Sequence, residues 1–118
     1  MHTWMAKFRY AGQGLVHAFI SQRSFHVHLP IGLLVLLLAV WLELEPWRWC
    51  GLVLCIGMVL SMELMNTAIE LLVRVLHPEQ DPTIGTALDT AAAAVLVAAI
   101  AAATVGLIIL LQPLWASL

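Results

Sequence analysis

A few polar side chains recur at helical spacing in the otherwise apolar segment SMELMNTAIELLVRVL, residues 61–76. They are Glu63, Asn66, Thr67 and Glu70. Residues three and four apart lie one above the other on a helix, so these four share one face, and Arg74 continues it by one turn. Carboxylates near hydrocarbon are costly and usually face a bundle interior, where they carry function. The alternative is a structural set of interhelical hydrogen bonds and snorkelling side chains.

A third carboxylate, Asp89, opens the next apolar run. We expect Glu63, Glu70 and Asp89 to converge with Asn66 at one membrane boundary. Such hard oxygen ligands suit Mg²⁺, which often bridges one or two carboxylates to substrate phosphates. One carboxylate could instead act as a general base. Activating a hydroxyl and neutralising phosphate charge would need little more. Asp89 alone could also be a charge favoured at a helix N-terminus.

The composition indicates that the bilayer is the solvent. The 118 residues are 63% hydrophobic and 10% charged, against roughly 25% charged residues in a soluble domain. The net charge of −2 gives no indication of nucleic-acid binding. Cys50 and Cys55 lie in an apolar run without metal-site spacing, so we interpret them as packing residues.

The uncharged stretches predict one all-α membrane domain, residues 1–118. A spanning helix needs about 20 apolar residues, and the predicted spans are 28–43, 48–73 and 88–112. Residues 1–22 are expected to form an amphipathic helix, either on the membrane surface or packed on the bundle. The two loops are expected at ELEPWRW (43–49) and HPEQDPT (77–83), with Asp81 capping the next helix, Pro82 at its first position and tryptophans anchoring the first loop at the interface.

Basic residues predict the orientation. Four of the five are expected on one side of the membrane: Lys7, Arg9, Arg23 and Arg74. Only Arg48 is expected on the other side. The positive-inside rule therefore predicts a cytoplasmic N-terminus and a cytoplasmic second loop in a bacterial inner membrane. We expect no cleavable signal peptide, because the first apolar run starts late and lacks a small-residue cleavage site.

Three motifs together resemble the small prokaryotic diacylglycerol kinase family, which includes undecaprenol kinases. They are MELMNTAIE (62–70), ALDTAAAAV (87–95) and RSFHVH (23–28). The resemblance covers nearly the whole chain. It implies a homotrimer of three-span subunits, each with a surface helix. It also implies shared active sites at the cytoplasmic interface that phosphorylate a lipid alcohol with MgATP.

The resemblance also implies roles for individual residues. Glu63 resembles the family's general base, Glu70 its metal ligand and Asn66 an amide that organises the site. Asp89 resembles an acid on the nucleotide side. Lipid, bilayer and a second copy of the chain are therefore the expected partners, with Mg²⁺ and ATP as cofactor and co-substrate.

Three positions depart from the family pattern. Gln22 stands where a metal-sharing Glu is usual, Leu88 where a Lys faces the ATP phosphates, and Arg74 where an Asp is usual. These changes should weaken MgATP binding, although Arg74 could restore a positive charge. His26 and His28 could supply metal ligands or interface hydrogen bonds.

Three functions remain open on the sequence alone. The first is a lipid kinase. The second is a lipid phosphate phosphatase that has lost ATP use, in which Glu63 would activate water. The third is a catalytically silent lipid-binding homologue, which the four retained polar residues disfavour.

Overall fold

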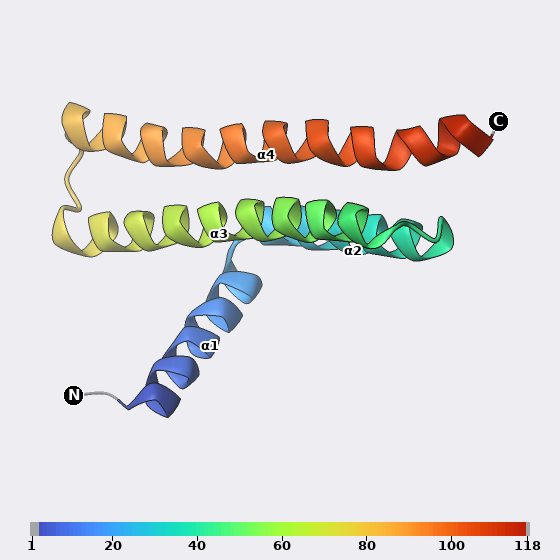
Figure 1. Cartoon of the computed structure of the whole chain (residues 1–118). Coiled ribbons are helices and arrows are strands. Elements are labelled where there is room, and N and C mark those ends of the chain that lie inside the picture. Colours follow the sequence, from blue (N-terminus) through green and yellow to red (C-terminus); the bar gives the residue numbers. More distant parts are fainter. Residues whose placement is uncertain (1–2, 118) are drawn as a thin grey trace.

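The computed structural model describes residues 3–117 as four helices. They are α1 (Trp4–Ser21), α2 (Arg23–Trp41), α3 (Pro46–Leu76) and α4 (Pro82–Ser117). Helices α3 and α4 run side by side and antiparallel, α2 packs against α3, and α1 projects away from them (Figure 1). Helices α2, α3 and α4 are each long and apolar enough to cross a bilayer. The predicted all-α integral membrane fold is therefore confirmed.

The helices extend beyond the predicted spans at several ends. Helix α2 begins at Arg23 instead of residue 28, and α3 runs from Pro46 to Leu76. The predicted first loop, residues 43–49, is therefore longer than the observed one, because Trp47, Arg48 and Trp49 belong to α3. Hydropathy marks the part of a helix that lipid surrounds, whereas backbone hydrogen bonding continues into the headgroup region. The positions of the membrane boundaries stay predictions.

The turn between α2 and α3 is closed by backbone hydrogen bonds. Glu43 N donates to Val40 O at 3.1 Å, and Leu44 N donates to Ala39 O at 3.3 Å. Glu43 adopts a left-handed φ of 54°, which is the usual way to end a helix with this bonding pattern. Buried Leu44 then packs on Ala39 in the core. The turn thereby brings α3 back along α2.

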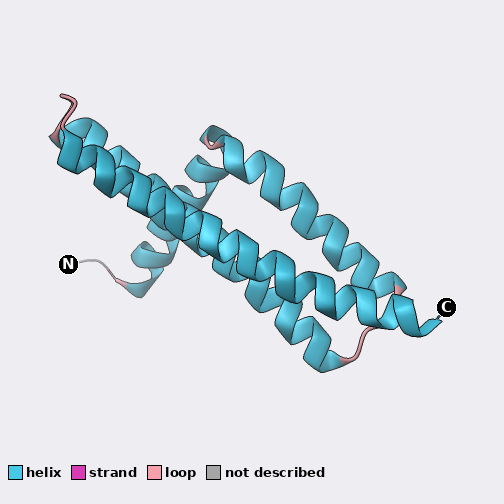
Figure 2. Ribbon diagram, turned by 90° about the horizontal axis from the view of Figure 1, so that it is seen from above, coloured by secondary structure: helices cyan, strands magenta, loops and turns pink. Residues whose placement is uncertain are grey.

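The second turn, between α3 and α4, ends in the helix cap that the sequence predicted. Asp81 Oδ1 accepts hydrogen bonds from Thr83 N at 2.8 Å and from Ile84 N at 3.2 Å. Pro82 is the first residue of α4. These features confirm the predicted cap. In the described part of the chain, loops connect the helices, and Thr3 precedes α1 (Figure 2).

The core lies at the end of the bundle near the first turn. Its buried residues are Ala39, Leu44, Leu52, Ile109 and Leu110, with Trp49 packed against them. At Gly51 an added Cβ would lie 2.6 Å from Cδ1 of Ile109, so glycine lets α3 and α4 approach closely. Trp49 is thus partly used in packing, whereas Trp41 is 73% exposed. Both cysteines are free.

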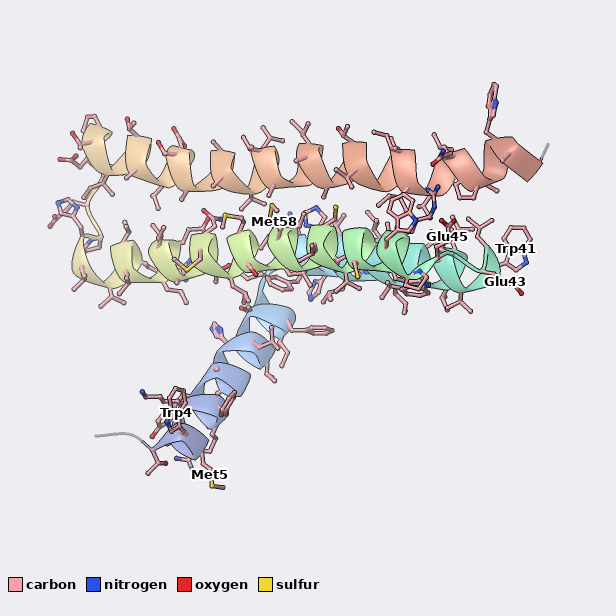
Figure 3. All side chains as sticks on the ribbon, in the orientation of Figure 1. Trp4, Met5, Trp41, Glu43, Glu45 and Met58 are labelled. Carbon is pink, nitrogen blue, oxygen red and sulfur yellow. The ribbon has the colours of Figure 1, made fainter. Side chains whose placement is uncertain are left out.

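Arg48 is buried and connects α3 to the end of α4. It donates from Nη1 to the Ile109 carbonyl at 2.9 Å and from Nη2 to Gln112 Oε1 at 2.5 Å. Its Nε donates to Glu45 Oε1 at 3.2 Å. Hydrogen bonds from Trp47 and then from Arg48 lower the pKa of Glu45 below its ordinary value. Glu43 and Glu45 lie at this end, near Trp41 (Figure 3).

Helix α1 forms where the amphipathic helix was expected. Thr3 caps it by accepting a hydrogen bond from Ala6 N at 3.2 Å. Only Ala18 is buried among its described side chains. Large apolar side chains such as Trp4 and Phe8 stay more than 70% exposed. The rest of the described chain therefore does not cover the apolar face of α1.

Candidate active site

Glu63 lies in the buried seam of α3. The buried residues of this helix are Arg48, Leu52, Val59, Glu63 and Thr67. Their spacing of four and seven residues keeps them on one side of the helix. Glu63 is only 3% exposed and Thr67 only 7%. The inner part of the polar stripe thus continues an apolar packing seam, which is a costly position for a carboxylate.

His28 on α2 is the partner of Glu63. Its Nδ1 makes a short hydrogen bond to Glu63 Oε1. The second oxygen, Glu63 Oε2, is also buried but has no hydrogen-bond partner among the described residues. The carboxylate is therefore held by a described residue through one oxygen only.

Asn66 and Glu70 continue the stripe and interact with each other. Asn66 Nδ2 donates to Glu70 Oε1 at 3.0 Å. Asn66 Oδ1 is buried without a partner in the part of the chain that the structure describes. Both side chains are half-buried. The stripe thus holds two unpaired buried oxygens, from Glu63 and Asn66.

An apolar groove of about 440 Å³ lies between α2, α3 and α4. His28 and Leu60 line one part of it, and Leu52, Ala103 and Leu110 line it further along. Its lining is otherwise aliphatic, apart from Cys55. Because His28 also touches Glu63, the groove ends beside the buried carboxylate. Its apolar lining suits a hydrocarbon chain, and His28 is the lining residue that bonds to Glu63.

A second, more polar pocket of about 870 Å³ lies where α3 turns into α4. Glu70, Arg74 and Leu88 line it together with the loop that contains Glu79 and Asp81. Carboxylates outnumber the arginine in this lining, so an anion would enter more favourably together with a divalent cation. Glu70 lines this pocket and is hydrogen-bonded to Asn66, which lies between Glu63 and Glu70 along α3.

In the described chain, the remaining candidate residues have no hydrogen bond or ion pair with Glu63, Asn66 or Glu70. Asp89 lies near the start of α4 and is exposed, while its neighbour Leu88 lines the polar pocket. Gln22 is half-buried between α1 and α2. His26 Nε2 contacts the Phe19 carbonyl at 3.0 Å. No group of three or more His, Cys, Asp or Glu residues converges among the described residues.

Sequence reasoning gave His28 either metal ligation or an interface hydrogen bond, but it did not identify Glu63 as the partner. A signal for it exists, because a buried carboxylate in a membrane requires a donor on a neighbouring helix. His28 lies near the start of α2 and Glu63 in the second half of α3, and these two parts meet because the helices are antiparallel. Which face of α2 meets α3 depends on packing, so the pairing needed the structure.

Comparison with known proteins identifies the family. The sequence pattern described as prokaryotic diacylglycerol kinase matches residues 9–110. A diacylglycerol kinase of Synechocystis is 41% identical over 93% of this chain, which spans 63% of that relative's length. An undecaprenol kinase of Bacillus subtilis is 33% identical over 97% of this chain and 93% of its own. A diacylglycerol kinase of Escherichia coli K12 is 32% identical over 79% of this chain and 76% of its own. The chain therefore belongs to the prokaryotic diacylglycerol kinase family.

Proposed function

We propose that the protein is a membrane lipid kinase, which transfers the γ-phosphoryl group of ATP to the hydroxyl of a lipid alcohol. The observation that carries this proposal is the buried Glu63, which has an unpartnered Oε2 and is bonded through Oε1 to His28, a residue that lines an apolar groove. Family membership supports the reaction class. The names of the relatives suggest diacylglycerol and undecaprenol as the alcohols to test first.

In the proposed reaction Glu63 acts as general base. Its Oε2 takes the proton of the lipid hydroxyl, and the hydroxyl oxygen forms a bond to the γ-phosphorus. The bond from that phosphorus to the β–γ bridging oxygen breaks, and ADP leaves with the electron pair. A base in hydrogen-bond reach of the reacting hydroxyl contributes roughly 10²–10⁴-fold in rate. The apolar groove lining would limit the access of water on the lipid side.

The donor set fits Mg²⁺, which prefers oxygen ligands and commonly uses one or two carboxylates with substrate phosphates. Glu70 would hold the ion, and the unpaired Asn66 Oδ1 is a hard oxygen on the same stripe. When bound, Mg²⁺ would neutralise charge on the transferring phosphates. Arg74 lies in the same pocket as Glu70 and would bind phosphate oxygens. Gln22 and Asp89 would complete the nucleotide side from neighbouring elements or from a second subunit.

We further propose a homotrimer in the bacterial inner membrane, with the N-terminus and the 77–81 loop in the cytoplasm. Basic residues predominate at that end. Helix α1 would lie on the cytoplasmic leaflet, because its exposed apolar side chains have no cover among the described residues. Lys7 stacks on Trp4 at 4.8 Å, which is suited to an interface that combines apolar and anionic groups.

Hydrolysis of a lipid phosphate is the second candidate. Arg74 lines the polar pocket beside Glu70, and Leu88 stands where the family resemblance implies a phosphate-binding lysine. In this reaction Glu63 would take a proton from water, and the water oxygen would bond to phosphorus. The bond from phosphorus to the lipid oxygen would break, and that oxygen would leave and be protonated. This reaction requires no nucleotide.

The deciding experiment uses the purified chain in detergent with two separate assays. The first assay contains γ-labelled ATP, Mg²⁺ and either diacylglycerol or undecaprenol. The second contains the corresponding lipid phosphates and Mg²⁺ without nucleotide. Labelled lipid is the expected result, and release of inorganic phosphate without labelling would favour the phosphatase. Arg74→Ala should abolish phosphate release if the phosphatase is correct. Inactivity in both assays would favour the silent homologue.

A further inference from the structure

The contact between His28 and Glu63 has a fixed hydrogen-bond direction. An ionised carboxylate only accepts hydrogen bonds, so His28 must donate from Nδ1 to Glu63 Oε1. In the neutral imidazole this assigns the proton to Nδ1 and leaves Nε2 unprotonated. His28 is 30% exposed and Glu63 is 3% exposed. The hydrogen-bond donor, His28, is therefore the more exposed partner, and the acceptor, Glu63, lies in the buried seam of α3.

Removal of this donor would leave both oxygens of Glu63 unsatisfied. Oε2 already lacks a partner among residues 3–117. A buried polar group without any partner is strongly destabilised. The carboxylate would then rotate or attract water, and Oε2 would no longer lie in a fixed position. The imidazole also lines the apolar groove, so it touches both the base and the space proposed for the lipid.

We propose that His28 is a positioning residue for Glu63. This inference rests on the proposed kinase function. The Nδ1–H group holds Oε1, fixes the carboxylate orientation and leaves Oε2 as the only proton acceptor toward the lipid hydroxyl. This role uses Nδ1 and is separate from metal ligation, for which Nε2 would be the remaining nitrogen. His28 thus acts on the rate of proton removal through Glu63.

Three substitutions of His28 distinguish a role in positioning Glu63 from a role in packing. In His28→Asn the amide Nδ2 occupies about the place of Nδ1 and keeps the donor. In His28→Gln the amide nitrogen is one bond further from the backbone, so it does not occupy the position of Nδ1. His28→Ala removes the donor entirely. His17→Asn is the matched control, because His17 lies on α1 and its ring hydrogen-bonds to Ser21 one turn away, far along the chain from Glu63.

The measured quantities are kcat and the KM for the lipid alcohol, with labelled ATP and full-length protein in detergent. We expect His28→Ala and His28→Gln to lower kcat by roughly a hundredfold, the scale of a small misplacement of a catalytic group. The KM should change by less than about threefold, and His28→Asn should recover at least about a tenth of the wild-type kcat. His17→Asn should behave as wild type. A wild-type kcat in His28→Ala would overturn the proposal, as would equal loss in His28→Asn and His28→Gln, or an effect confined to KM.

A second measurement does not depend on activity. ¹⁵N NMR of histidine-labelled wild type reports the tautomer, and the His28 signal is assigned by its loss in His28→Asn. The Nδ1-protonated form is expected, and an Nε2-protonated His28 would overturn the pairing. Glu63→Gln provides the reference for the kinase itself. An inactive wild type would overturn the kinase proposal and with it the positioning role of His28. Full activity in His28→Ala with an inactive Glu63→Gln would overturn the positioning role alone.

Discussion

Asn66 and Glu70 are joined across one turn of α3 by a 3.0 Å hydrogen bond from the Asn66 amide to Glu70 Oε1. The bond fixes one oxygen of Glu70, and the carboxylate also lines the polar pocket. Glu63 lies two turns away, about 10 Å along the helix axis at 1.5 Å per residue, beside the apolar groove. Helix α3 thus carries one carboxylate that is bonded to a groove residue, His28, and a second that lines the polar pocket, with Asn66 between them.

Glu63→Gln tests the general base. Glutamine keeps the size and can still accept the hydrogen bond from His28, but it cannot take a proton. We expect kcat to fall by at least about a hundredfold, with an unchanged thermal unfolding midpoint. Labelled-lipid assays and thermal scans in detergent would check both quantities. Normal turnover would mean that the buried carboxylate is structural.

Glu70→Gln tests the metal ligand. Removing the charge while keeping the hydrogen bond from Asn66 should raise the Mg²⁺ concentration for half-maximal activity by roughly tenfold or more. At saturating Mg²⁺ most of the rate should return. The matched control is Glu43→Gln, because Glu43 lies at the other end of the bundle (Figure 3). An unchanged Mg²⁺ dependence in Glu70→Gln would assign the ion to other residues.

Arg48→Leu tests the connection between α3 and α4. The substitution leaves Gln112 Oε1 without its donor, which should destabilise the fold by about 1–3 kcal/mol. The double variant Arg48→Leu/Gln112→Leu should recover part of the loss, since both polar partners are then replaced. Thermal or denaturant unfolding in detergent would measure this. Equal stability of Arg48→Leu and wild type would show that these hydrogen bonds contribute little.

The sequence predicted the parts of the fold that depend on local chemistry. Hydropathy indicated the three spanning helices, and Asp81 with Pro82 indicated the start of α4. The burial of Arg48 was not predicted, because a basic residue between two apolar runs is typical of a loop. Its partners on α4 lie far along the chain, at Ile109 and Gln112. Contacts between distant residues depend on helix rotation, which a periodic pattern on one helix does not determine.

In the candidate site too, the sequence predicted which residues share a face of α3 but not which residues of other helices they meet. Its spacing predicted a shared helix face, and the structure puts Glu63 and Thr67 in the buried seam. The expected convergence with Asp89 depends on the rotation of α4. In the described chain Leu88 lines the pocket beside Glu70, and Asp89 is exposed. Whether Asp89 serves a site shared between subunits is a prediction about the assembly.

Trimer formation is expected to use the alanine stripe on α4, since small residues let membrane helices approach closely. The stripe comprises Ala87, Ala91, Ala94 and Ala98. Ala98 is already buried within the chain, whereas Ala94 is exposed. Ala94→Leu should therefore lower the trimer fraction in native mass spectrometry. Ala92→Leu is the control, because it lies about 200° around the helix. A fully active wild-type monomer would contradict the prediction.

Leu88→Lys and Gln22→Glu test whether the nucleotide side has been weakened. Leu88 lines the polar pocket with Glu70 and Arg74, so a lysine there would place an ammonium group near the proposed phosphate site. Gln22→Glu would add a carboxylate for the metal. Each change should lower the KM for MgATP. The double variant should improve it by more than the product of the two single effects, because both residues act on one ion–phosphate cluster.

The control for these two variants is Cys50→Ser, a change at an exposed position near the first turn. It should leave the KM for MgATP unchanged. If the protein is instead a phosphatase, the added lysine and carboxylate should bring no ATP-dependent labelling. Purely multiplicative effects of the two substitutions would mean that residues 22 and 88 act on separate sites, and an unchanged KM in both would place the nucleotide elsewhere in the assembly.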